Sequence, residues 1–212
     1  VFRDELLNAD PAIPPGDVVE VADRQGAFVA CAFYNAGSHI PLRIASLVPD
    51  EAIDASWLRR GITRAISRRA HLTQTNAKRL VFSEADQLPG LIVDQYADSL
   101  VVQFRSAGMD RWRGSVVELL NTLLQPKGIL ERSDKEFRKE EGLPMTTAVL
   151  AGDVPPRILI HEGPLQFLVD PHHGLKTGFY LDQRPTRTRL LHLVEPGQRF
   201  LDAFSYTGSL GI

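Results

Sequence analysis

Hydrophobic and polar residues alternate in three short runs near the start of the chain, and this period of two predicts β-strands. The runs span residues 16–21, 27–34 and 40–47, and the turn sequence DRQG (23–26) separates the first two. Consecutive strands joined by short turns pair antiparallel. Residues 1–48 are therefore predicted to form a small antiparallel β barrel.

Residues 50–72 follow the period of an α-helix, with apolar residues on one face. Arg60, Arg64 and Arg68 recur at every fourth position on another stripe. Like charges at this spacing repel by roughly a few tenths of a kcal/mol per pair, so the stripe does not serve helix stability. Two interpretations are equally open. The arginines form a ridge that contacts phosphate groups, or they form a solvated linker face that pairs with acidic residues elsewhere in the chain.

Residues 73–152 mix both periods and predict an α+β domain. Five acidic residues in this region could be imagined as a metal or acid–base cluster, but they flank turns, and Arg132 and Arg138 offer them partners. No histidine joins them at a spacing typical of metal ligands, so no metal site is predicted. The predicted order is strands at 79–84, 90–95 and 99–105, a helix at 109–125, a strand at 128–131 and a short helix at 132–141; the acidic residues are Glu84, Asp86, Asp94, Glu131 and Asp134.

The last sixty residues predict a hairpin at 157–170, a helical stretch over 181–193 and a buried strand at 199–204. The strand leads into a turn of small and hydroxyl residues, 205–209. A strand that ends in a glycine-bearing turn opens nucleotide sites in doubly wound α/β folds. Neither GxGxxG nor GxxxxGK[ST] is present. What remains is D-x-F-x-x-x-G (202–208), a form often found at S-adenosylmethionine (SAM) sites.

Composition narrows the functional classes. The net charge of −2 gives no global attraction to nucleic acid, so RNA binding would need a local basic face. The single cysteine, Cys31, excludes an internal disulfide and fits a reducing compartment. No apolar run is long enough to cross a bilayer, and no signal peptide is present. A cytoplasmic protein without a membrane partner is expected. The first residue is valine, so both ends look like cuts in a longer polypeptide.

Two segments of the C-terminal region together carry a family resemblance. KTGFYLDQRPTR (176–187) followed by LDAFSYTG (201–208) resembles the ribosomal RNA cytosine-C5 methyltransferases of the RlmI type. LPGLIVDQY (88–96), ILERSD (129–134) and EEGL (140–143) match further landmarks of that family in the expected order. The chain departs from the family at Leu175, where histidine is usual, and at Ser209, where a second glycine is frequent.

The resemblance implies an α+β, multi-domain architecture. It begins with a PUA-like β barrel, here residues 1–48 and incomplete at its N-terminus. A basic linker helix (49–72) and a central mixed α/β domain (73–152) follow. Residues 153–212 would hold a hairpin and the start of a Rossmann-like, SAM-dependent methyltransferase domain. The resemblance also suggests a homodimer.

The resemblance further implies a methyltransferase for ribosomal RNA that uses SAM and attacks cytosine through a cysteine thiolate. That cysteine would lie beyond Ile212, and Cys31 is in the wrong domain, so the chain as given is expected to hold no catalytic residue and no activity. An RNA-binding module without catalysis, or methylation of another RNA atom, are the alternatives. The residues expected at the cofactor are Lys176, Thr177, Gln183, Arg187, Phe204, Ser205, Tyr206, Thr207 and Gly208, and those expected at RNA are Arg60, Arg64 and Arg68.

Overall fold

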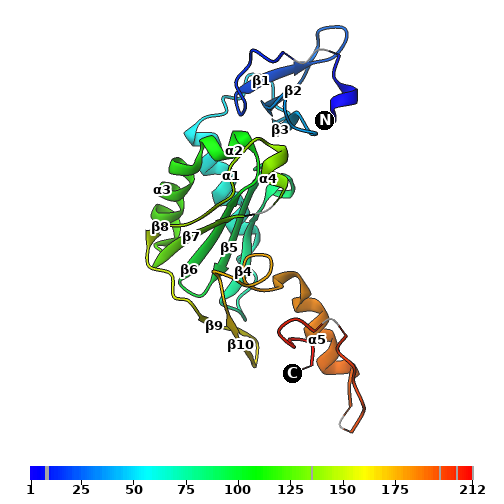
Figure 1. Ribbon diagram of the computed structural model, residues 1–212, viewed down its shortest axis with the longest axis vertical. Coiled ribbons are helices and arrows are strands. Elements are labelled where there is room, and N and C mark those ends of the chain that lie inside the picture. The colour runs from blue at the N-terminus through cyan, green and yellow to red at the C-terminus, as the bar shows by residue number, and fades with distance from the viewer. Residues whose placement is uncertain (8–9, 135, 196, 204, 212) are drawn as a thin grey trace.

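A computed structural model of the chain describes residues 1–7, 10–134, 136–195, 197–203 and 205–211. Three parts follow one another along the long axis of the molecule, with the two termini near opposite ends (Figure 1). An N-terminal module comes first, a central sheet with its helices lies in the middle, and a hairpin with a C-terminal helix lies at the other end.

The N-terminal module contains the three strands that the alternating pattern predicted. They are β1 (Val18–Ala22), β2 (Phe28–Tyr34) and β3 (Leu42–Ser46), paired antiparallel in the order β1-β2-β3. Ala32, Tyr34 and Leu42 form its small core. In the described residues these strands form an open sheet, because β1 and β3 pair only with β2.

Helix α1 (Ala55–Arg68) is shorter than the predicted 50–72 because its start is fixed by a cap. The side chain of Asp54 accepts a hydrogen bond from the Trp57 amide at 2.9 Å. Trp57 and Ile62 are buried against the central sheet, as the helical period predicted.

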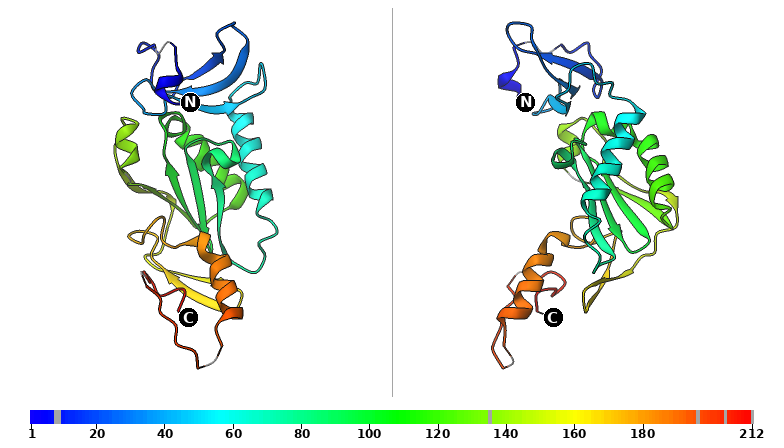
Figure 2. Two further views of the ribbon diagram at one scale, coloured as in Figure 1. Left: turned by 90° about the vertical axis from the view of Figure 1, so that its right-hand side faces the viewer. Right: turned by 180° about the vertical axis from the view of Figure 1, so that it is seen from behind.

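The central sheet has five strands in the order β4-β5-β6-β7-β8, and only the pair β6–β7 is parallel. Its helices α1 and α3 cover one face, and the view from behind shows α1 in front of the strands (Figure 2). The sequence analysis missed β8, an edge strand rich in threonine and alanine with a half-exposed burial pattern. The strands are β4 (Ala77–Phe82), β5 (Leu91–Tyr96), β6 (Ser99–Phe104), β7 (Gly128–Ser133) and β8 (Thr146–Gly152).

Two predicted helices of this domain differ from the observed ones. The stretch 109–125 is split at Trp112 into α2 (Ala107–Arg111) and α3 (Arg113–Leu124). Strand β7 extends into the stretch 132–141, where a helix was predicted, because Arg132 and Ser133 pair with β8. Only α4 (Phe137–Glu140) is helical there.

The predicted hairpin is present as β9 (Ile158–Glu162) and β10 (Leu165–Val169). Its apolar side chains pack on the second face of the central sheet, against Tyr96, Val101 and Leu130 among others. The turn η3 (Leu181–Gln183) and helix α5 (Arg184–Leu193) follow, and Pro185 stands in the first turn of α5, where its missing N–H costs no hydrogen bond.

The buried strand predicted at 199–204 is wrong for the residues described. Residues 199–203 are not in a strand, and Leu201 is 85% exposed. A parallel strand is stable only when neighbouring strands complete its hydrogen bonds and helices cover its faces. Within the described residues no strand lies beside this segment. Among all the residues that the structure describes, no helix is both long and apolar enough to cross a membrane.

Candidate functional site

The loop that carries Lys176 and Thr177 is tied to the central sheet by buried polar side chains. Thr177 is 1% exposed, and its hydroxyl bonds the carboxylate of Asp94 and lies 2.9 Å from the hydroxyl of Tyr96. The Tyr96 oxygen also accepts the Phe179 amide at 3.2 Å. Burial, together with the nearby charge of Asp94, raises the pKa of Tyr96, so this phenol stays neutral. Thr177 was expected at the cofactor, but its hydroxyl is hydrogen-bonded to side chains of β5 in the central sheet.

Strand β7 holds the same loop from a second side. The guanidinium group of Arg132, 3% exposed, donates to the carbonyl oxygens of Pro171 at 2.7 Å and Gly174 at 3.3 Å. Hydrogen bonds from a charged donor are among the stronger ones in proteins. The loop 170–178 is therefore positioned by the central domain.

Helix α5 is anchored by one glutamate of the hairpin. Arg187 forms a two-pronged ion pair with Glu162, with N–O distances of 2.7 and 2.8 Å, and Arg184 reaches the same carboxylate at 3.3 Å. Arg187 is 2% exposed, and its guanidinium lies 4.7 Å from the centre of the Phe179 ring. Arg187, expected to pair with a cofactor carboxylate, is thus already engaged with Glu162, and we assign it a positioning role.

The two segments that carry the family resemblance meet in space. The Tyr206 hydroxyl accepts the Leu175 amide at 2.8 Å, and the rings of Tyr206 and Tyr180 lie edge to face with centres 5.4 Å apart. Lys176 stands 4.4 Å from the centre of the Tyr180 ring and pairs with Asp182 at 2.6 Å. Lys176 and Tyr206 both have a positive φ, at 58° and 51°. Such strained positions persist only where the surroundings impose them.

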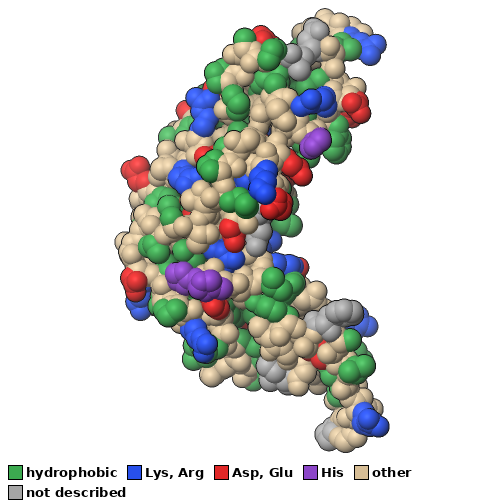
Figure 3. All heavy atoms as spheres, in the orientation of Figure 1, with side chains coloured by type: hydrophobic (Ala, Val, Ile, Leu, Met, Phe, Trp, Pro, Cys, Tyr) green, Lys and Arg blue, Asp and Glu red, His purple; other side chains and the backbone are tan. Residues whose placement is uncertain are grey.

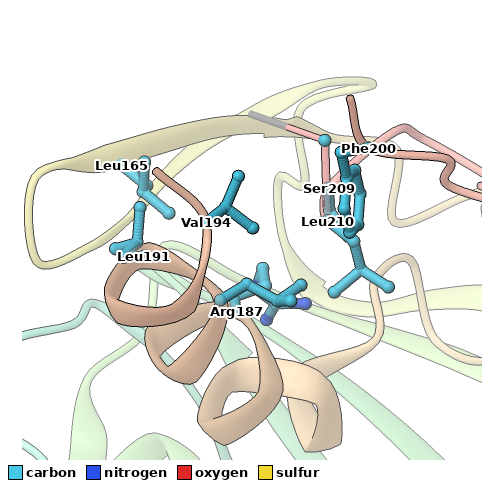
Figure 4. Close-up of a pocket in the computed structure, with 9 residues that line it drawn as sticks. Leu165, Arg187, Leu191, Val194, Phe200, Ser209 and Leu210 are labelled. Atoms are coloured by element: carbon cyan, nitrogen blue, oxygen red, sulfur yellow. The ribbon is translucent and has the colours of Figure 1, made fainter. Parts of the chain in front are cut away.

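A cavity of about 260 Å³ lies between α5, the hairpin and the C-terminal segment (Figure 4). Arg187 forms part of it, and Phe200, Ser209 and Leu210 border it from the C-terminal segment. Its lining is largely apolar, and its volume falls below the roughly 300–1,000 Å³ of typical ligand pockets. Gln183 is exposed and is not part of the lining.

The turn 205–208 is open to an approaching ligand. Gly208 has a φ of 69°, its amide donates to Ser205 at 2.8 Å, and no atom lies within 4 Å of where a β-carbon would stand. Ser205 and Thr207 are exposed. Phe204, the remaining predicted residue of this turn, lies outside the described residues.

A buried acceptor beside this turn has no partner. The Oδ2 atom of Asp202 is enclosed, and it has no hydrogen bond within the described part of the chain. Burial of an unpaired carboxylate oxygen is costly, which makes it a candidate for binding a cationic group. Asp202 was recognised within the motif D-x-F-x-x-x-G but was not predicted as a site residue.

The sequence analysis also missed Glu162, Asp94 and Tyr96, which position the loop and the helix. The signal for Glu162 was present, because residues 158, 160 and 162 of β9 alternate inward. Asp94 was considered only as one of the acidic residues, and Asp94 and Tyr96 only as part of the landmark 88–96; neither was assigned to the site, since their partner Thr177 lies far along the chain.

The arginine stripe of α1 has partners from elsewhere in the chain. Arg60 pairs with Glu51 at 2.7 Å, and Arg68 reaches Asp86 at 3.3 Å. Arg64 bonds only the neutral amide of Gln87 among the described residues. The solvated-face interpretation therefore describes Arg60 and Arg68, and Arg64 keeps an uncompensated charge.

Neither the lone thiol nor the acidic residues form a reactive centre. Burial, followed by the charges of Glu20, Glu51 and Asp50, raises the pKa of Cys31, which disfavours the nucleophilic thiolate. The acidic residues of the central domain pair with arginines, as Asp94 does with Arg79 at 2.7 Å. In the ranges that the structure describes, no group of three or more potential metal ligands occurs.

Comparison with known proteins places this geometry in context. A family profile described as a PUA-like domain matches residues 1–47. Ribosomal RNA large subunit methyltransferase I of Shigella flexneri serotype 5b is 37% identical over 216 residues, which cover 100% of this chain and 54% of that protein. The chain thus spans about half the length of the curated relatives that it matches.

Two solved structures share the fold. One, from Streptococcus mutans and assigned as a SAM-dependent methyltransferase, has a TM-score of 0.79 at 23% identity over 93% of this chain and 51% of its own. The other, assigned as a methyltransferase in complex with SAH, has a TM-score of 0.80 at 23% identity over 95% and 52%. The expected α+β class is confirmed. The chain is similar along its whole length to the ribosomal RNA large subunit methyltransferase I proteins, and its first 47 residues match the PUA-like domain profile.

Proposed function

We propose that the protein is a SAM-dependent methyltransferase that modifies ribosomal RNA of the large subunit, at C5 of a cytosine. The observation that carries this proposal is the 37% identity to a ribosomal RNA large subunit methyltransferase along the whole chain. The contact of Leu175 and Tyr180 with Tyr206 supports it, because it joins the two motifs on which the resemblance was first recognised.

The residues present fit one part of the cofactor. SAM carries an ammonium group, and the buried, unpaired oxygen of Asp202 is an acceptor of the right charge. The open backbone at Gly208 admits a ligand close to the main chain. Asp202 and Gly208 would hold the amino-acid end of SAM, and Tyr206 would border it. Lys176 and the exposed Gln183, Ser205 and Thr207 remain predicted contacts.

Arg187 and Thr177 act indirectly, by positioning the elements that border the pocket. Arg187 keeps α5 on the hairpin through Glu162, and Thr177 keeps the loop on the sheet through Asp94. Bound SAM supplies an electrophilic methyl group on its sulfonium. These residues would hold the backbone of the pocket in place.

Cytosine C5 is a weak nucleophile, and this decides what else the reaction needs. Addition of a cysteine thiolate to C6 would make C5 enamine-like, so that its electron pair would form the bond to the methyl carbon while the bond from that carbon to sulfur breaks and the demethylated cofactor, SAH, leaves. A base then takes the C5 proton, and the thiolate leaves as the C5–C6 double bond returns. Cys31 is unsuited to this step because its pKa is raised. The nucleophile is therefore expected outside these 212 residues.

The proposal is tested with the full-length protein, SAM labelled in its methyl group and large-subunit ribosomal RNA that lacks the modification. We expect label in 5-methylcytosine after digestion to nucleosides. Label in another nucleoside would overturn the cytosine assignment, and absence of any label would overturn the methyltransferase. Asp202→Asn should weaken SAM binding by roughly 1.5–3 kcal/mol in calorimetry, the range for a hydrogen bond to a charged group.

A second candidate function is RNA binding by the N-terminal part without catalysis. Arg64 on α1, which has no carboxylate in hydrogen-bonding range among the described residues, favours it. Steeply salt-dependent RNA binding by the chain, combined with no SAM binding by the full-length protein, would support this alternative.

A further inference from the structure

The face of the central sheet opposite α1 and α3 carries aromatic and arginine side chains side by side. The hairpin packs on one part of this face, around Tyr96 and Leu130. In the left view of Figure 2 the strands are visible without a helix over them. Figure 3 shows the molecule hollowed along one side, between its N-terminal and C-terminal parts.

Strand register places four side chains on this face beyond the hairpin; two of them, Ile92 and Gln103, are buried, whereas Phe82 and Arg105 reach the surface. Phe82 of β4 is opposite Ile92 of β5, and Ile92 is opposite Gln103 of β6. Arg105 follows Gln103 by two residues and so continues on the same face. Arg79 belongs to this group as well, because its guanidinium lies 5.0 Å from the centre of the Phe82 ring.

Arg105 is the unusual member. Its guanidinium lies 4.1 Å from the centre of the Phe137 ring, and within the described residues it has neither a hydrogen bond nor an ion pair. Burial and the neighbouring guanidinium groups of Arg43 and Arg79 lower the pKa of Arg105, against an opposing pull from Glu84. Glu84 is itself paired with Arg43 at 2.9 Å. A half-buried positive charge is thus held without a counter-ion of its own.

Phe82 is the second unusual member, because a large aromatic ring at the sheet surface is 46% exposed. Arg79, which stacks on it, has its charge met by Asp94 at 2.7 and 2.8 Å. An exposed ring and, on the same face, a guanidinium without a counter-ion offer a nucleobase a stacking partner and a phosphate a charged donor.

We propose that this surface, defined by Phe82, Arg105 and Phe137 and hereafter the open-face surface, docks a single-stranded segment of RNA. A base stacks on Phe82, and a backbone phosphate pairs with Arg105. The charge and the aromatic rings are complementary to that occupant. This inference rests on the proposed function, since it assigns the site at which the RNA substrate is held away from the reacting base.

The test measures binding of a fluorescently labelled, mixed-sequence single-stranded RNA to the 212-residue chain over a series of salt concentrations. Arg105→Gln should reduce the slope of log K against log salt by about 0.7, the value for one phosphate contact with a single strand. Phe82→Ala should weaken binding by at least about fivefold and leave the slope unchanged. Arg157→Gln, an exposed arginine outside α1 and outside this surface, is the matched control and should change neither quantity.

A further variant separates stacking from a structural role. Phe82→Trp retains an aromatic ring, so it should bind RNA as the parent does, and its added fluorescence should be quenched when RNA binds. If the parent chain binds RNA but Arg105→Gln and Phe82→Ala behave like Arg157→Gln, the open-face surface is not the docking site, and the proposed function stands. If the parent chain does not bind the RNA at all, this inference falls, while methyl transfer by the full-length protein still decides the proposed function.

Discussion

Two buried glutamates join the outer parts of this protein to its central sheet, and they do so differently. Glu141, which follows α4, binds the N-terminal module through Ser38 at 2.7 Å and Arg43 at 2.9 Å, and it also accepts the Ala107 amide at 3.1 Å. Glu162 of the hairpin binds the C-terminal helix through Arg184 and Arg187. The first carboxylate is satisfied by one arginine and several neutral donors, the second mainly by two arginines.

This difference predicts how strongly each contact, the N-terminal junction at Glu141 and the C-terminal junction at Glu162, is destabilised when its glutamate is replaced. Removing Glu162 leaves Arg187 buried without a counter-charge, whereas removing the charge of Glu141 leaves most of its donors neutral and Arg43 still paired with Glu84. Loss of one partner of a buried ion pair costs more than loss of the pair, because the remaining charge stays desolvated. The C-terminal junction should therefore be the more sensitive one.

The largest effect is expected for Glu162→Ala. We predict a loss of about 3–5 kcal/mol in the docking of α5, the cost of an uncompensated buried charge. Amide hydrogen exchange in residues 184–193 should accelerate accordingly. Glu140→Ala, an exposed glutamate, is the control. Equal protection of α5 in both variants would remove Glu162 as the anchor, and Glu162→Ala combined with Arg187→Met should recover part of the loss.

A smaller, pH-dependent effect is expected at Glu141. Burial acts to raise the pKa of Glu141, but hydrogen bonds from Ser38 and Ala107 and the charge of Arg43 outweigh it and hold the pKa below its ordinary value. A lowered folded-state pKa stabilises the junction above the unfolded value of about 4.3. That stability is lost as the pH falls through the folded value.

Acidification below about pH 4.3 should thus loosen the N-terminal module, and Glu141→Gln should already be loosened at pH 7, by roughly 1.5–3 kcal/mol. Trp57 reports this, since its ring lies 6.0 Å from that of Phe33 in β2. Its fluorescence would be followed in a Trp112→Phe background. A pH profile that is the same with glutamate and with glutamine at position 141 would contradict the assignment.

The smallest effect on stability is expected for an exposed ion pair. Comparing it with the buried pairs shows how much burial contributes to their effect. Arg60 and Glu51 are paired at 2.7 Å, but the Arg60 side chain is 58% exposed. Arg60→Gln should change the free energy of unfolding by at most about 1 kcal/mol, as water and salt screen such pairs. Arg64→Gln should reduce RNA affinity more than Arg60→Gln, because only Arg60 has a carboxylate partner. Equal losses in RNA titrations would show that pairing does not matter.

The local pattern of hydrophobic and polar residues predicted the presence of helices and strands better than the residues at which they begin and end. The strands β1 to β7 and the hairpin were found because their alternation or their apolar runs reflect burial of one or both faces. The edge strand β8 was missed because its threonines and alanines bury little. The strand predicted at 199–204 failed for a related reason, since an apolar run becomes a strand only beside strands that complete its hydrogen bonds.

The candidate site was predicted in part. The helical stretch was expected to bring Gln183, Arg184 and Arg187 near the turn 205–209. The structure joins Tyr206 of this turn to Leu175 and Tyr180 instead, and Arg184 and Arg187 pair with Glu162. The pairing of Arg187 with Glu162 was not expected, because nothing near Arg187 in the sequence indicates which carboxylate will face it. The predicted cofactor and RNA contacts stay predictions; the Arg60 and Arg64 variants test two of the RNA contacts.

The sequence by itself determined the order of the elements, the class of fold and the two motifs on which the family resemblance depends. These properties are encoded in periods of two and 3.6 residues and in short local spacings. Only the tertiary structure decided which charged side chains form ion pairs and which do not. Whether an arginine meets a carboxylate depends on residues 25 positions away for Arg187 and 98 for Arg43, and long-range packing alone brings them within a hydrogen bond.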